Sequence, residues 1–105
     1  MNHLSLAALL LAGTIYLGRA EHSAIDPQPR GDDGWKRRQA SFNEKVKEVG
    51  KKSQLLFIGD SITQGWEGDA KDIWAERFAK YDAINLGIGG DRTQHVLFRL
   101  DNGNL

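Results

Sequence analysis

The 105-residue sequence contains no cysteine and only two prolines. The absence of cysteine excludes disulfides, cysteine-ligated metals and a thiol nucleophile, and it leaves the redox compartment open. An excess of charge of one sign is also missing, because fourteen basic residues balance fourteen acidic ones. This balance gives no reason to expect a nucleic acid or an anionic membrane surface as a partner. No internal repeat is present, and the length suits one small domain at most.

One apolar stretch stands apart at the N-terminus. Leu4 to Leu17 is interrupted by only two hydroxyl side chains, which makes it long enough for a signal-peptide core and short for a membrane span. Gly18 and Ala20 then place small residues at the minus-three and minus-one positions of a cleavage site. We expect a cleaved signal peptide over residues 1–20, no stable membrane span, and a secreted or periplasmic protein. An uncleaved anchor and a buried helix are the alternatives.

The next stretch, residues 21–34, contains proline, glycine and aspartate and almost no apolar side chains, so we interpret it as a leader or linker. A domain is predicted over residues 35–105. It opens with a helix over Trp35–Val49 that ends at Gly50 as a C′ residue. Three side chains at i, i+4 and i+7 form an apolar stripe that can pack on a sheet: Phe42, Val46 and Val49. The basic run at residues 36–38 is interpreted as a solvated helix face.

The run Leu55 to Ile58 is continuous and apolar, which is typical of a buried strand in a parallel sheet. Gly59, Asp60 and Ser61 follow it in a tight turn. Because ligands of open α/β sheets bind beyond the carboxyl ends of the strands, the Ser61 hydroxyl is a candidate nucleophile. The structural alternative is a helix N-cap, a position that favours both Asp and Ser. We assign Asp60 to holding the turn, not to proton transfer.

The rest of the chain alternates helices and strands. The pattern predicts a loop over residues 66–69, a helix from Asp69 or Ala70 to about Lys80, a strand over Ala83–Ile88, and a helix from Arg92 or Thr93 to about Leu100. The side chains predicted to face inward from these two helices are Ile73, Trp74, Phe78, Val96, Leu97 and Leu100. Trp66 either lines a pocket or packs in the core. The alternation implies right-handed parallel crossovers and an α/β sandwich.

Three glycines surround the second junction between a strand and a helix: Gly87, Gly89 and Gly90. A phosphate cradle fits poorly, because the Gly-Lys-Ser/Thr of a P-loop is missing and the spacing departs from Gly-x-Gly-x-x-Gly. A second interpretation is structural, in which the glycines permit a tight turn and close helix packing. A third is that backbone N–H groups here stabilise an oxyanion during acyl transfer from Ser61.

Two blocks together resemble the SGNH (GDSL-type) hydrolases, a family of serine esterases and lipases: Gly-Asp-Ser-Ile-Thr-Gln-Gly-Trp at residues 59–66 and Ala-Ile-Asn-Leu-Gly-Ile-Gly-Gly-Asp-Arg-Thr at residues 83–93. Within the family, the chain looks most like the branch around the catalytic subunits of platelet-activating factor acetylhydrolase. The resemblance implies an α/β fold, a flavodoxin-like three-layer α/β/α sandwich with a parallel sheet. It also implies that Ser61 is the nucleophile, that the N–H groups of Ser61 and Gly90 form the oxyanion hole, and that no metal or organic cofactor is needed.

Histidine is scarce, and no obvious base for Ser61 is present. Of the three histidines, His3 falls in the predicted signal peptide and His22 in the leader. His95 lies four residues after Asp91, and we interpret that pair as a decoy in which His95 caps or packs a helix. The resemblance places the catalytic Asp-x-x-His near the C-terminus of the whole domain. Its Gly-x-Asn block, which supplies a third oxyanion donor, is also missing.

We therefore expect a truncated, N-terminal part of a hydrolase domain, with an unpaired sheet edge and little turnover of its own. The parent protein is predicted to be a serine esterase that cleaves short acyl esters, such as acetyl groups, from a lipid or carbohydrate through an acyl-enzyme on Ser61. The alternatives are a non-catalytic module that binds a glycan or anionic ligand, and an inactive fragment. The sequence leaves the acyl chain, the alcohol portion and the oligomeric state open.

Overall fold

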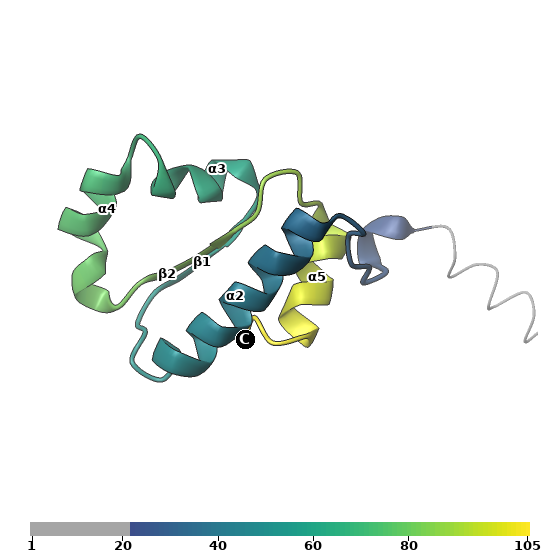
Figure 1. The fold of residues 1–105 in the computed structure, drawn as a ribbon, viewed down its shortest axis with the longest axis horizontal. Coiled ribbons are helices and arrows are strands. Elements are labelled where there is room, and N and C mark those ends of the chain that lie inside the picture. The colour runs from purple at the N-terminus through teal and green to yellow at the C-terminus, as the bar shows by residue number, and fades with distance from the viewer. Residues whose placement is uncertain (1–21) are drawn as a thin grey trace, which may run out of the picture.

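The computed structural model describes residues 22–105, so the predicted signal peptide over residues 1–20 lies outside the described residues. The chain contains α-helices and two strands (Figure 1), together with three short 3-10 helices (η) in the described residues. In chain order the elements are η1 (Ser23–Ile25), α2 (Asp33–Val49), β1 (Leu56–Gly59), α3 (Ser61–Gln64), η2 (Gly65–Glu67), α4 (Lys71–Arg77), η3 (Ala79–Tyr81), β2 (Ile84–Gly87) and α5 (Thr93–Asp101). None of the helices in this range is long and apolar enough to cross a membrane.

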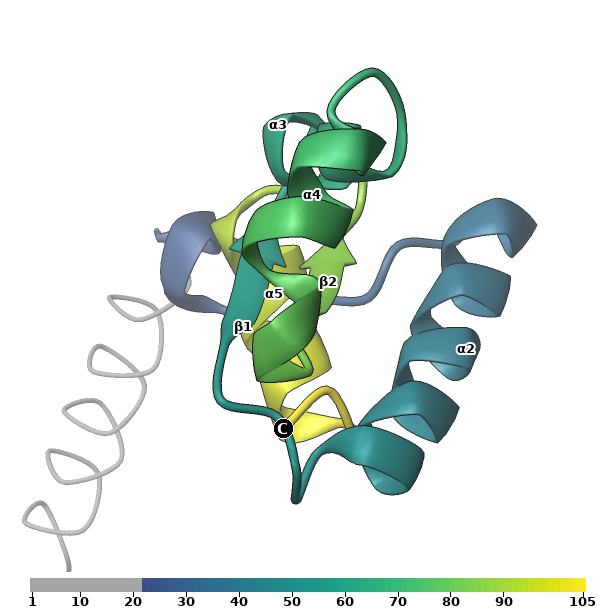
Figure 2. The same ribbon diagram turned by 90° about the vertical axis from the view of Figure 1, so that its left-hand side faces the viewer.

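The two strands form a parallel pair in which Leu56 is opposite Ile84 and Gly59 is opposite Gly87. Helices α3 and α4 lie on one side of the strands, and α2 and α5 lie on the other (Figures 1 and 2). The predicted α/β architecture with a parallel sheet is confirmed at this level. Because both strands run in the same direction, their carboxyl ends lie at the same edge, where ligands of such sheets bind.

The main core lies between β2 and α2. Successive side chains of a strand point to opposite faces, so alternate residues of β2 and the residue after it face α2. The buried core consists of Trp35, Phe42, Ile84, Leu86 and Ile88, with Val46, Val49, Ile58 and Phe98 packed against it. The stripe predicted for α2 therefore packs as expected. Gly50 ends this helix with a right-handed φ of −57°, so it does not adopt the left-handed conformation usual for a C′ glycine.

The opposite face of the sheet carries an aromatic cluster. Its members are Phe57, Trp66, Trp74 and Phe78, with ring centroids 5.2–6.5 Å apart. Trp66 therefore packs against other aromatic rings, as one of its two interpretations expects. Trp74 and Phe78 are spaced i, i+4 and reach the sheet from the same helix face. Ile73 lies beside that face and is 52% exposed, so its predicted inward position is wrong.

Several boundaries differ from the predicted ones. Helix α3 begins at Ser61, directly after the turn, and the predicted loop over residues 66–69 begins as the 3-10 helix η2. Helix α4 ends at Arg77, short of the predicted Lys80, and η3 takes over. The chain then leaves through Asp82 in a left-handed conformation with a φ of 51°. Such a residue stops helical hydrogen bonding and redirects the backbone into β2.

The segment before α2 packs on the fold, although its composition predicted only a leader. The backbone N–H of Gln28 donates to the carbonyl of Gln94 at 3.1 Å. The Thr93 hydroxyl donates to the carbonyl of Ala24, also at 3.1 Å. Figure 1 shows this segment beside α5. Residues 22–32 therefore lie next to the first turn of α5, close to the carboxyl ends of the strands.

Candidate active site

The two motif blocks meet at the carboxyl ends of the strands. Ser61 follows β1 after a single residue, and Gly89 follows β2 after a single residue. A Cβ atom placed on Gly89 would lie 3.7 Å from the Cβ atom of Ser61, which is van der Waals contact. Ser61 is exposed at the start of α3. The fold thus brings the predicted nucleophile beside the glycine turn, although the two are separated by more than twenty residues in the sequence.

Asp60 holds the turn before the serine. Its Oδ1 accepts a hydrogen bond from the Ile62 N–H at 3.0 Å, which makes it the N-cap of α3. Its carbonyl accepts from the Gln64 N–H at 2.9 Å and closes the first helical turn. Since Asp60 does the capping, the Ser61 side chain is not used for this purpose. The structural interpretation of the Gly-Asp-Ser motif and the catalytic one are therefore compatible.

Two backbone N–H groups at the carboxyl ends of the strands have no hydrogen-bond partner in the described part of the chain. Among residues 22–105, no hydrogen-bond acceptor engages the N–H of Ser61 or of Gly90. The first turn of a helix leaves its N–H groups free, which accounts for Ser61. Gly90 has a φ of +82°, a left-handed conformation in which glycine is favoured. The oxyanion role predicted for both groups stays a prediction, and these free donors are consistent with it.

A buried ion pair ties the two strand ends together. Arg99 and Asp91 have fully buried side chains and are joined from Nε to Oδ2 at 2.9 Å. The same guanidinium donates to the carbonyl of Leu86 at 2.8 Å and to that of Gly59 at 3.3 Å. Its Nη1 also donates to Oδ1 of Asn104 at 3.0 Å. Burial lowers the pKa of Arg99 below its usual value, and the nearby Asp91 carboxylate opposes this change.

His95 and Asp91 do not form a catalytic pair. His95 accepts a hydrogen bond from the Arg92 N–H on its Nδ1 at 2.9 Å, and its backbone N–H donates to the Arg92 carbonyl at 3.1 Å. Asp91 is occupied by other donors, including the indole Nε1 of Trp35 at 2.8 Å. The capping role expected for His95 is therefore confirmed. Within the described residues, no group of three or more His, Asp or Glu side chains is arranged to hold a metal ion.

Comparison with known proteins identifies homologues. The chain is 41% identical to platelet-activating factor acetylhydrolase IB subunit alpha1 of Rattus norvegicus over 92 residues, which cover 84% of the chain and 38% of that protein. It is 44% identical to subunit alpha2 of Homo sapiens over 84 residues, which cover 80% of the chain and 34% of that protein. The chain is a partial homologue of these SGNH hydrolases. No family model matches it.

This SGNH homologue spans little more than a third of the length of the curated relatives that it matches. A third relative, subunit alpha1 of Bos taurus, is 42% identical over 89 residues and is covered to a similar extent, 37%. The resemblance drawn from the two motif blocks is thereby confirmed. The match covers at least 80% of the chain, so it reaches well beyond the two blocks.

Sequence reasoning missed Arg30, which lies in the predicted leader of the homologue. Its Nη1 donates to the carbonyl of Gly89 at 2.7 Å and to Oδ1 of Asp91 at 3.2 Å. Its Nε donates to Oδ1 of Asp32 at 3.1 Å. Asp32 caps α2 by accepting from the Trp35 N–H. Although desolvation raises the pKa of Asp32, hydrogen bonds from the Trp35 N–H and the charge of Arg30 lower it below its usual value.

Arg99 was missed as well, because a cation on a predicted helix is expected at the surface. The inward side of α5 was predicted from its aliphatic residues, but its buried residue is this arginine. Val96, Leu97 and Leu100 are only half-buried. No local pattern reveals either arginine, because both bind backbone carbonyls that lie far away in the sequence.

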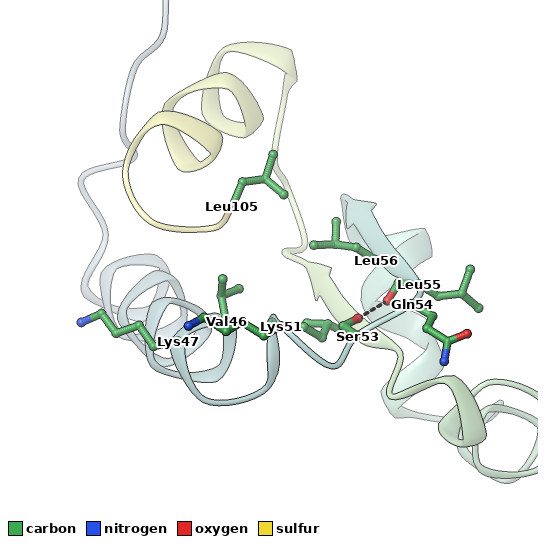
Figure 3. A pocket seen from close by; sticks show the side chains of 10 residues that line it. Val46, Lys47, Lys51, Ser53, Gln54, Leu55, Leu56 and Leu105 are labelled. Atoms are coloured by element: carbon green, nitrogen blue, oxygen red, sulfur yellow. Dashed lines mark hydrogen bonds between the residues drawn. The ribbon is translucent and has the colours of Figure 1, made fainter.

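Two cavities lie at opposite ends of the sheet. One of about 410 Å³ is at the carboxyl end of β1, between Gly59 and Asp60 on one side and α5 residues Val96 and Leu97 on the other. It adjoins the turn that carries Ser61. The other, of about 460 Å³, lies at the amino end of the strands, where Figure 3 shows Leu105 and Leu56 on opposite sides of it. No predicted site residue lines this second cavity.

Proposed function

We propose that this chain forms the nucleophile-bearing part of a serine ester hydrolase with the flavodoxin-like three-layer α/β/α sandwich of the SGNH family. The observation that carries the proposal is the proximity of Ser61 to Gly89 at the carboxyl ends of two parallel strands. Acyl transfer needs a nucleophile and oxyanion donors at one place, and this edge supplies both. The homology to acetylhydrolase subunits supports the same class of reaction.

The proposed reaction begins when the Ser61 hydroxyl oxygen attacks the ester carbonyl. A general base must take the hydroxyl proton, and we assign this role to the histidine of an Asp-x-x-His that the described residues do not contain. The N–H groups of Ser61 and Gly90 stabilise the oxyanion. Collapse of the tetrahedral intermediate breaks the ester bond and releases the protonated alcohol. Water then attacks the acyl-enzyme with the same histidine as base, one of its protons passes to the Ser61 oxygen, and the acyl group leaves as the carboxylic acid.

The substrate is proposed to be a short-chain acyl ester, such as an acetyl ester, of a lipid or carbohydrate. The name of the relatives supports an acetyl group. The cavity of about 410 Å³ beside Asp60 offers space next to Ser61 for the acyl or the alcohol portion. The reaction requires no metal or organic cofactor. The expected signal peptide would place this activity outside the cytoplasm.

The test is covalent labelling of the full-length protein with a fluorophosphonate, which reacts only with an activated serine. We expect the wild-type protein to be labelled and Ser61→Ala to lose labelling and ester hydrolysis completely, since no other group replaces the nucleophile. Ser41→Ala is the matched control, because Ser41 is an exposed serine on α2 that bonds only its own helix. Equal labelling of wild type and Ser61→Ala would refute the assignment. A folded but unlabelled wild-type protein would favour a binding module.

A further inference from the structure

One peptide group of the glycine turn is held by an arginine from outside the motif. The Gly89 carbonyl and the Gly90 N–H belong to the same peptide, and Arg30 Nη1 donates to that carbonyl at 2.7 Å. The guanidinium also covers the face of the turn, since a Cβ atom placed on Gly90 would lie 3.1 Å from the same nitrogen. In a trans peptide the C=O and N–H bonds point in opposite directions. Fixing the carbonyl therefore fixes the direction of the N–H.

We propose that Arg30 is a positioning residue of the oxyanion hole, which holds and polarises the Gly89–Gly90 peptide so that the Gly90 N–H donates to the oxyanion. This inference rests on the proposed function. A charge-assisted hydrogen bond to the carbonyl is stronger than a neutral one and withdraws electron density from the peptide. The Gly90 N–H thereby becomes both better aimed and a better donor.

The turn needs such support because two adjacent glycines have little conformational preference of their own. Gln64 secures the preceding peptide, because its Oε1 accepts from the Gly89 N–H at 2.6 Å. Arg30 secures the following one through the Gly89 carbonyl. With these two contacts in place, the Gly90 N–H is a donor of this turn that has no partner among the described residues. Preorganised donors of this kind contribute most to catalysis, since they need no rearrangement during the reaction.

Arg30 is itself well fixed. Its Nε pairs with Asp32 at 3.1 Å and its Nη1 with the buried Asp91 at 3.2 Å, and its side chain is only 25% exposed. Asp32 is in turn held as the N-cap of α2. The guanidinium therefore has a carboxylate on two sides and the glycine turn on a third. An arginine with this geometry loses little freedom when it binds the carbonyl.

Arg38 provides a matched control. It also comes from the N-terminal part of the chain and donates to a backbone carbonyl at the end of β2, that of Gly87, from Nε at 3.0 Å and from Nη2 at 2.8 Å. Its side chain is 23% exposed, close to the value for Arg30. It does not bind the peptide that contains the Gly90 N–H. Replacing Arg38 therefore removes an equivalent contact without touching the proposed donor.

The experiment uses the full-length protein and its Arg30→Gln, Arg30→Lys and Arg38→Gln variants. The readouts are the amide resonance of Gly90 and the rate of labelling by a fluorophosphonate, with p-nitrophenyl acetate separating kcat from KM. We expect Arg30→Gln to shift the Gly90 resonance and to lower labelling and kcat roughly tenfold, with KM little changed, because a misaimed oxyanion donor weakens transition-state binding. Arg30→Lys should recover part of the loss.

The Arg38→Gln variant should leave the Gly90 resonance in place and the labelling rate within about twofold of wild type, since it keeps the oxyanion donors intact. Suppose that the wild type is labelled but Arg30→Gln keeps the wild-type labelling rate or the wild-type Gly90 resonance. That result would overturn the role of Arg30 and leave the proposed hydrolase function standing. Equal effects of Arg38→Gln and Arg30→Gln would also overturn that role. An unlabelled wild-type protein would instead overturn the proposed hydrolase function and, with it, the catalytic meaning of the contact.

Discussion

At Gly87 the backbone of helix α3 closely approaches strand β2. A Cβ atom at this position would overlap the backbone nitrogen of Gln64 and would lie 2.7 Å from the carbonyl carbon of Thr63. The side-chain amide of Asn85 stabilises the same close packing by donating a hydrogen bond to the Thr63 carbonyl at 2.8 Å. Close packing of backbone on backbone therefore requires glycine here, as the structural interpretation of this glycine expects. Because Ser61 is the first residue of α3, this packing also determines its distance from the sheet.

Gly87→Ala should lower the free energy of unfolding by about 1–3 kcal/mol, because the methyl group forces two backbone segments apart. Gly65→Ala is the control, since a Cβ atom there meets nothing within 4 Å and the backbone has an ordinary helical φ of −57°. That variant should be neutral or more stable by up to about 1 kcal/mol, because alanine restricts the unfolded chain. Urea unfolding of the full-length protein measures both, and equal stabilities would contradict the packing argument.

At the scale of elements, α5 is joined to both strands through one buried side chain. Arg99 contacts the carbonyl of Gly59 at the end of β1 and that of Leu86 within β2. Its partner Asp91 lies in the loop that contains the oxyanion candidate Gly90. A lone buried charge is costly, whereas this guanidinium is paired and hydrogen-bonded. The strand ends, the loop of the glycine turn and α5 are therefore joined through one buried pair.

Arg99→Met should reduce the free energy of unfolding by about 3–5 kcal/mol, because Asp91 loses its buried partner. Arg99→Lys keeps the charge but not the fork of donors, so its stability should fall between those of wild type and Arg99→Met. Lys47→Ala is the control, since its pair with Glu44 is 74% exposed at both ends and such pairs add little stability. Chemical denaturation followed by tryptophan fluorescence measures the series. A change for Arg99→Met no larger than that for Lys47→Ala would contradict the role of the pair.

For the molecule as a whole, the decisive feature is the outer edge of β1, which has no neighbouring strand in the described residues. Within residues 22–105, β1 pairs with β2 alone, so the unpaired edge expected from the sequence is confirmed. Apolar side chains accompany this edge, since Leu55 is 36% and Leu56 is 37% exposed. An unprotected edge with apolar side chains is a template for pairing with another chain. The described segment by itself therefore presents a surface that favours association.

Residues 22–105 expressed alone should self-associate, and Leu56→Lys should reduce this association, because a charge on an edge strand opposes strand pairing. Ile25→Lys is the matched control. Ile25 is also an exposed apolar residue, at 69%, but it lies in η1 and not on a strand. Sedimentation velocity at equal concentrations measures the effect. Equal loss of association in both variants would show that general charge, not the strand edge, is responsible.

Local sequence patterns determined the order of the two strands and the three longer helices. The apolar run before Gly59 predicted β1, and the stripe through Phe42 predicted the buried face of α2. The Gly-Asp-Ser and Gly-Gly-Asp blocks predicted which residues follow the strands. These features depend on residues within a few positions of one another, so periodicity and turn chemistry are sufficient to reveal them. The capping role of His95 was instead expected from the family resemblance, which places the catalytic histidine elsewhere.

Only the tertiary structure decided which distant side chains complete the site. Arg30 binds a carbonyl 59 residues away, and Arg99 binds one 40 residues away. Neither position carries a local signal, because a long cationic side chain is expected in solvent until a fold supplies a carbonyl and a carboxylate within reach. The sequence by itself determined a serine at the end of a parallel strand beside a glycine turn. The packing of α3 and of the segment before α2 against the strand ends decided how that turn is held, since hydrogen bonds between remote segments exist only after the chain has folded.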